Sequence, residues 1–449
     1  MTAPFVSTSL LDATRLATPA VEALLRGHGA RVWRTGAAAR AALVDAPIPA
    51  WVELITDGDA STCDVVLGTV ASLANPAQVD LTRLDGRPIE DVLRTRGITI
   101  DAIAVDSADM AGVLDPFEGR AHLAAGVLRS IAPPDTAFRD HPALLVTVGQ
   151  VIAWTDFPVT AEVRRTAIRD SGNVLDVPDR RAAWGRSLNG LLLGPSVDKG
   201  LQWLQDARVL HFLMPEVAAM VGFDKTCAVH HKDIWDHTKI VTQKAVPDLV
   251  VRWAALCHDI GKIWTRTVNK SGKVHFFRHE DHGALLFEGI AHRVGLPQWL
   301  TDRVSYLIAN HSRVNLYQDD WTDSAVRRLI RETENHLPDL LAFSKADFTT
   351  KREARIEEMR RLLADLEARI LRVAEEDAKE PPLSKGLGNT LMVRFGLPPC
   401  RLIGDLKKTL EETIARGDLT ARAEDAYYVD WIQDQPALIA RIRAAGGMA

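Results

Sequence analysis

In the middle of the chain the sequence reads Leu256-Cys257-His258-Asp259-Ile260-Gly261-Lys262, with a histidine and an aspartate side by side after an apolar run. Neutral imidazole and ionised carboxylate are both ligands of divalent first-row metals. Gly261 allows the chain to turn directly after the pair. The stretch therefore predicts a helix end at which both side chains face one metal ion.

More histidines and one more aspartate lie on either side of this pair at wide spacing. A mixed set of nitrogen and oxygen ligands with open coordination positions favours an ion that activates water, which makes hydrolysis the most direct expectation. The four cysteines lie far apart without a CxxC pair, which argues against a thiolate zinc site. The candidate metal ligands are His237, His258, Asp259, His279, His311 and Asp347.

Composition places the chain among ordinary globular proteins of two to four domains. It has 449 residues, of which 47% are hydrophobic and 25% charged, with a formal net charge of −5. The negative charge does not indicate a nucleic-acid binder, so an RNA-binding face would have to be local. The sequence has no signal-peptide pattern and no apolar run long enough for a membrane span, so we expect a soluble, cytoplasmic protein without membrane contact.

Two parts of the chain differ in their apolar patterning. Up to about Pro116, short apolar runs such as 65–70 and 98–105 suggest strands alternating with helices. From about Gly119 onward the spacing is almost entirely helical, with one hairpin expected around 270–273 and a long amphipathic helix over 350–378. The nearby tryptophans are expected in the core rather than as base-stacking residues: Trp235, Trp253, Trp264 and Trp299.

The order of the candidate ligands resembles that of the HD superfamily of metal-dependent phosphohydrolases. The resemblance implies that Asp259 is the central, catalytic ligand and that one or two divalent ions bind, whether manganese, iron, nickel, cobalt or magnesium. His237, His258 and Asp347 would complete the first ion, and His279 and His311 would hold the second. Lys262, as a catalytic point charge, and Arg313 are candidates for contacting a substrate phosphate.

Other motifs cover nearly the whole chain. Asp115-Pro116-Phe117-Glu118-Gly119-Arg120 and the segment from Trp321 to Arg328 resemble bacterial class II tRNA nucleotidyltransferases and poly(A) polymerases with an HD domain. The resemblance implies an α+β fold, with a small mixed α/β nucleotidyltransferase-like head before an almost all-helical remainder. The expected parts are a head over 1–118, a helical neck and RNA-binding-like region over 119–222, the HD domain over 223–350 and a helical tail over 351–449.

The head departs from this family at the motifs that hold magnesium and nucleotide. The family needs a Gly-Gly turn, an Arg-Asp pair, an Asp-x-Asp pair and a further aspartate, because carboxylates hold two magnesium ions against the triphosphate. At the paired acids only Glu53 supplies a carboxylate, at the second position. The acids that remain in the head could be re-sited metal ligands, but we expect solvated or capping groups: Glu53, Asp57, Asp80 and Asp101. The departing positions are Gly36, Arg40, Trp51, Glu53 and Gly97.

Three functions follow from these patterns. The first hypothesis is an HD-type phosphohydrolase or phosphodiesterase acting on nucleotides or RNA ends, such as a 2′,3′-cyclic phosphate, with a polymerase-inactive head. An active CCA-adding tRNA nucleotidyltransferase with atypical head ligands is the second, and a non-catalytic RNA-binding protein the third. The expected partners are a nucleotide or an RNA 3′ end, with tRNA as one candidate.

Overall fold

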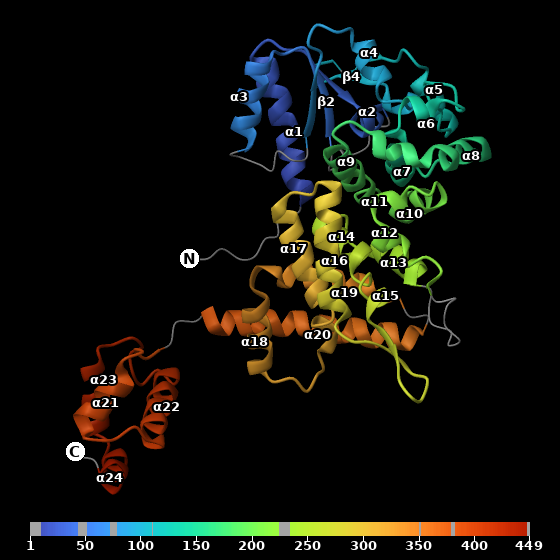
Figure 1. Ribbon diagram of the computed structural model, residues 1–449. Coiled ribbons are helices and arrows are strands. Elements are labelled where there is room, and N and C mark those ends of the chain that lie inside the picture. Colours follow the sequence, from blue (N-terminus) through green and yellow to red (C-terminus); the bar gives the residue numbers. More distant parts are fainter. Residues whose placement is uncertain are drawn as a thin grey trace. The chain divides into compact units, whose positions relative to one another are not determined.

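The computed structural model describes residues 10–43, 52–71, 79–109, 111–223, 234–349, 352–378 and 382–446. It divides into two compact units, Met1–Leu366 and Glu367–Ala449. The fold is α+β, as expected, with all strands of the larger sheet in the N-terminal part and helices elsewhere (Figure 1). Among the helices of the described ranges, none combines the length and the apolar character that crossing a bilayer requires.

The head is built on a mixed five-stranded sheet with the strand order β3-β2-β1-β4-β5. β2 and β3 run parallel, and the other neighbouring pairs are antiparallel. The strands are β1 (Val32–Thr35), β2 (Val52–Thr56), β3 (Val79–Arg83), β4 (Ala104–Asp106) and β5 (Val113–Leu114). The head helices are α1 (Leu10–Gly27), α2 (Gly36–Leu43), α3 (Ala60–Ala71), α4 (Ile89–Arg94) and the 3₁₀ helix η2 (Thr99–Asp101).

Successive side chains of β2 point to opposite faces of this sheet. Val52 and Leu54 pack with buried side chains of α1 and α3 in one core cluster. Ile55 belongs to a second cluster with Trp33 and with residues of α4. Glu53 lies between the two apolar residues of the first cluster, so its side chain points to the sheet face opposite α1 and α3.

A neck of short helices follows the head and continues into the HD domain. Trp253 donates from its indole to Asn189 Oδ1 at 2.7 Å, and the buried Arg252 guanidinium donates to the carbonyls of Leu192 and Gly194. These bonds join the neck to the centre of the HD domain. The neck helices are α5 (Gly119–Ala125), α6 (Ala137–Asp140), α7 (Leu144–Thr155), α8 (Ala161–Asp170), η3 (Ser171–Asp176), α9 (Arg180–Leu192), α10 (Val197–Asp206), α11 (Leu210–Leu213) and α12 (Pro215–Ala218).

The HD domain is helical apart from one hairpin. Its elements are α13 (Ile234–Lys244), α14 (Leu249–Cys257), α15 (Lys262–Thr265), β6 (Arg266–Val268), β7 (Val274–Phe276), α16 (His279–Val294), α17 (Gln298–Asn310), η5 (Val314–Leu316), α18 (Asp323–Thr333), η6 (Glu334–His336) and α19 (Leu337–Asp347). Every residue of α14 is buried, and Asp248 caps the helix by accepting from the backbone N–H groups of Val250 and Val251.

The long helix α20 (Glu353–Ala378) crosses from the first unit into the second. The second unit contains α21 (Leu387–Phe395), α22 (Arg401–Ala415), α23 (Asp425–Gln433) and α24 (Pro436–Ala444) around a core of its own. The long helix and the hairpin around 270–273 therefore agree with the sequence prediction.

Two expectations about local structure are wrong. Residues 65–70 belong to α3 rather than to a strand, because a short apolar run can be buried equally well by a helix. Trp264 and Trp299 are 49% and 39% exposed, whereas Trp235 and Trp253 are buried as expected. Trp264 lies in the short α15 at the base of the hairpin, none of whose residues is buried.

Candidate metal centre and head carboxylates

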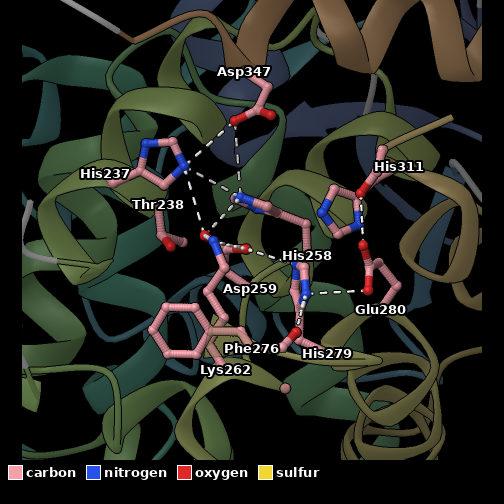
Figure 2. A network of polar contacts seen from close by, with 12 residues as sticks. His237, Thr238, His258, Asp259, Lys262, Phe276, His279, Glu280, His311 and Asp347 are labelled. Carbon is pink, nitrogen blue, oxygen red and sulfur yellow. Dashed lines mark hydrogen bonds and ion pairs between the residues drawn. The ribbon is translucent and has the colours of Figure 1, made fainter. Parts of the chain in front are cut away.

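The expected ligands of the HD domain come together from five helices, mostly at helix ends. His258 and Asp259 follow the last residue of α14, His279 begins α16, His311 follows α17, and Asp347 ends α19. His237 comes from the first turn of α13. Figure 2 shows the six side chains converging on one place. All six predicted ligands are therefore neighbours in space.

Three of the histidines are held in the same orientation by their own backbone. The Nδ1 atoms of His258, His279 and His311 lie 2.9, 3.0 and 2.7 Å from the carbonyl oxygens of Ala255, Phe276 and Ile308. A carbonyl oxygen can only accept, so each Nδ1 donates its proton there and each Nε2 faces the cluster. Such fixed imidazoles are typical of metal sites.

The ligand atoms form two groups of three, with the members of each within 4.8 Å of one another. The first group is His237, His258 and Asp347, and the second is Asp259, His279 and His311. His237 Nε2 lies 3.3 Å from Asp347 Oδ1 and 3.7 Å from Asp259 Oδ2, so the two groups adjoin. The donor set suits two neighbouring divalent ions with Asp259 between them.

Asp259 is the most constrained residue of the cluster. Its Oδ2 accepts from Lys262 Nζ at 2.8 Å, while its buried Oδ1, 2.7 Å from the same nitrogen, has no hydrogen bond of acceptable geometry. A bound cation would satisfy this oxygen, which is an observation in favour of metal binding. Lys262 thus contacts the central ligand, and its predicted role toward a substrate phosphate stays a prediction.

Electrostatics keep the carboxylates charged and some of the imidazoles neutral. Burial opposes ionisation of Asp259, but His258 and Lys262 overcome it and hold the pKa of that carboxyl well below its usual range. Burial lowers the pKa of His279 and brings that of His311 to about 4. Neutral imidazoles and ionised carboxylates are the forms that bind metal at neutral pH.

Two glycines allow α16 to approach the turn after α14. A Cβ on Gly261 would lie 2.1 Å from the carbonyl oxygen of His279, and one on Gly283 would lie 3.2 Å from the Ile308 side chain. The close approach places His279 beside Asp259, with Nε2 to Oδ1 at 3.7 Å. Arg313, the other predicted phosphate contact, forms an ion pair with Glu332 and reaches Asn310 Oδ1 at 3.3 Å.

The head has a second, smaller group of acids. Glu53 on β2 and Asp80 on β3 are direct partners in the parallel register, so both side chains point to the same sheet face. Glu53 Oε1 lies 3.4 Å from Arg96, and Asp80 Oδ2 lies 3.6 Å from Arg186 of α9. The sequence prediction treated Asp80 as solvated, because strand pairing across 27 positions leaves no local signal.

Two of the other predicted head positions, Gly36 and Arg40, lie near Glu53. Gly36 has φ +58°, and a Cβ there would lie 1.8 Å from Glu53 Oε2, so only glycine leaves room for this carboxylate. Arg40 is buried and paired with Asp101, and burial lowers its pKa to about 10 although Glu53 acts to raise it. Gly97, at φ +74°, contacts Leu144, and Trp51 lies outside the described residues. Asp57 accepts from the Arg31 backbone N–H, as a capping acid does.

The fold and the HD cluster together define an enzyme with a nucleotidyltransferase-type head and an HD domain, and the HD domain family model matches residues 233–376. The A-adding tRNA nucleotidyltransferase of Deinococcus radiodurans is 30% identical over 367 residues, covering 78% of this chain and 80% of that protein. The chain therefore belongs to the bacterial tRNA nucleotidyltransferase family.

Two further comparisons show lower similarity. The CC-adding tRNA nucleotidyltransferase of Thermus thermophilus is 27% identical over 365 residues, which cover 79% of this chain and 80% of that protein. Among solved structures, the CCA-adding enzyme of Bacillus stearothermophilus in complex with CTP aligns at a TM-score of 0.44 and 16% identity, over 94% of this chain and 96% of its own.

These relatives overturn the first functional hypothesis. Proteins similar over most of the chain are named tRNA nucleotidyltransferases, so the expectation of a phosphohydrolase with a polymerase-inactive head is wrong. The hypothesis gives most weight to the family's acids at their usual sequence positions and prefers solvated or capping groups for the remaining head acids. Strand pairing places one of these acids, Asp80, directly beside Glu53 on the sheet.

Proposed function

We propose that this chain is a tRNA nucleotidyltransferase, which transfers nucleotides from ATP, CTP or both to the 3′ end of tRNA. The observation that carries the proposal is the similarity to the A-adding enzyme of Deinococcus radiodurans over 78% of the chain. The structure adds two carboxylates, Glu53 and Asp80, that share one face of the mixed sheet.

In this proposal Glu53 and Asp80 hold the divalent metal of the head. Their position on paired strands suits one shared cation, and carboxylate oxygens are the ligands that magnesium prefers. When bound, the metal neutralises charge on the triphosphate. The chain's own residues supply the rest: Arg96 holds the Glu53 carboxylate in place, and Arg186 brings a positive charge from the neck to the same face.

The HD cluster is proposed as a separate centre for one or two divalent cations. The buried Asp259 Oδ1, which accepts no hydrogen bond, and the inward Nε2 atoms of three histidines support this. Because the candidate ligands come from five helices, bound ions would tie α13, α14, α16, α17 and α19 together.

An incorporation assay tests the proposed reaction and identifies the nucleotide added. Purified full-length chain with magnesium is given tRNA transcripts that lack the last one, two or three nucleotides of CCA, with labelled ATP or CTP supplied separately. We expect extension of at least one transcript. If ATP extends only the transcript ending in CC, the chain adds A; if CTP extends the shorter ones, it adds C. Failure to extend any transcript would contradict the proposal.

A further inference from the structure

The hairpin between α15 and α16 differs from the rest of the chain in its charge. Residues 262–278 contain five Lys or Arg residues and no Asp or Glu, within a chain whose formal net charge is −5. β6 and β7 pair in antiparallel register, and residues 267–273 around the turn are exposed. The hairpin extends away from the helices of the HD domain (Figure 1). The cations are Lys262, Arg266, Lys270, Lys273 and Arg278.

One face of this hairpin carries an exposed stack of aromatic rings. Phe277 is 68% exposed, and its ring lies parallel to that of His275, with centroids 5.1 Å apart and planes at 6°. Asn269 Nδ2 lies 3.3 Å from His275 Nε2 and steadies this stack. Trp264, at the base of the same hairpin, is 49% exposed. Large rings left open to solvent in such a place indicate a binding surface.

The neighbouring residue fixes the hairpin to the HD cluster. Phe276 lies under Lys262 Nζ, 5.7 Å from its ring centroid, and the same nitrogen contacts Asp259 (Figure 2). β7 ends at Phe276, and Phe277 follows it in the turn before α16, where its ring stacks on that of His275. The stack therefore adjoins Phe276, whose ring contacts Lys262 beside the cluster.

We propose that the hairpin surface formed by Trp264, Lys270, Lys273, His275 and Phe277 binds single-stranded RNA. A base would extend the His275–Phe277 stack, and the lysines would contact the flanking phosphates. Open rings interleaved with cations are the combination by which proteins hold single strands without reading sequence. The complete lack of acids over 262–278 favours a polyanion over a protein partner. The binding of single-stranded RNA does not depend on the proposed function. Only the identification of this RNA as the 3′ end of tRNA rests on that function.

The test measures binding of a fluorescent 12-nucleotide single-stranded RNA to the full-length chain by anisotropy, without nucleotide triphosphates. Phe277→Ala and Trp264→Ala should each raise Kd by roughly fivefold or more, whereas Phe277→Tyr keeps the ring and should restore affinity. Trp299→Ala, which removes a 39% exposed tryptophan of α17, is the matched control and should leave Kd unchanged.

The charges are tested by the salt dependence of the same binding. The double variant Lys270→Gln/Lys273→Gln should reduce the slope of log K against log salt by about 1.4, since each cation on a single strand contributes about 0.7. Lys407→Gln/Lys408→Gln on α22 removes the same charge elsewhere and should leave the slope unchanged.

Unchanged affinity in Phe277→Ala/Trp264→Ala, with an unchanged unfolding temperature, would overturn the proposal. A second outcome is that the double variant is a monomer in light scattering where the parent chain is an oligomer, while RNA affinity stays the same. The surface would then bind a second copy of this chain, and the proposal would also be wrong. Because no nucleotide is incorporated in this assay, a failed tRNA extension would contradict the proposed function and leave the binding result untouched.

Discussion

The HD cluster and the head carboxylates are two polar sites built in opposite ways. The HD cluster takes six ligands from five helices, and three of its histidines are fixed by their own backbone carbonyls. The head offers two acids on neighbouring strands, each beside an arginine and partly open to solvent. A buried, crowded ligand set suits tightly held ions, whereas an open pair leaves room for a substrate that brings its own phosphates.

The difference also explains why the sequence predicts a complete set of candidate ligands for the HD cluster but not for the head. Ligands at helix ends accompany short motifs, such as the His258-Asp259 pair before Gly261. Carboxylates on paired strands become neighbours through sheet register, which depends on packing far along the chain.

The largest effect is expected from Glu53→Gln. Removing the carboxylate charge from the centre of the head should lower nucleotide incorporation into tRNA by about 100-fold or more, because charge stabilisation is the main contribution to phosphoryl transfer. The measurement is the incorporation rate at saturating tRNA. Asp57→Asn removes an acid one residue beyond the same strand, where it only accepts a backbone hydrogen bond, and should retain the rate. Equal losses in both variants would contradict the assignment to Glu53.

Asp259→Asn should remove metal from the HD cluster. A central carboxylate carries charge that imidazoles cannot replace, so we expect at least a tenfold loss of affinity for manganese, measured by titration calorimetry and by metal content after dialysis. Chelation should lower the unfolding temperature of the parent chain by several degrees and that of the variant by less. Asp281→Asn, an exposed acid paired with Arg278 on α16, should retain the metal. Full metal content in Asp259→Asn would refute the cluster as a metal centre.

Gly261→Ala should destabilise the HD domain by about 2 to 3 kcal/mol, because the new methyl group would overlap the His279 carbonyl. Chemical denaturation measures the change. Gly289→Ala on α16 has nothing within 4 Å of the added Cβ and should stabilise the helix by up to about 1 kcal/mol. Similar changes in the two variants would show that the close approach of α16 is not required.

Arg186→Gln should have the smallest effect. Arg186 is half-exposed and 3.6 Å from Asp80, so its loss should raise KM for nucleotide a few-fold and change the free energy of unfolding by less than about 1 kcal/mol. Arg165→Gln on α8 removes another exposed arginine and should leave KM unchanged. If Arg186→Gln instead lowers the free energy of unfolding and leaves KM for nucleotide unchanged, Arg186 mainly joins the neck to the head.

The α+β class, the hairpin, the long helix and the convergence of His237, His258 and Asp347 could all be predicted from the sequence. The periodicity of apolar residues predicts helices, and local motifs of histidine and aspartate predict metal ligands. The helical state of residues 65–70 could not be predicted, because a short apolar run satisfies either a strand or a buried helix.

The sequence by itself determined which side chains can bind metal, because imidazole and carboxylate chemistry belongs to the residue and not to the fold. Only the tertiary structure decided that Asp80 lies beside Glu53 and that Trp264 and Phe277 are open to solvent. Strand register and burial are set by contacts between segments distant in sequence, so neither can be predicted from a short stretch of residues.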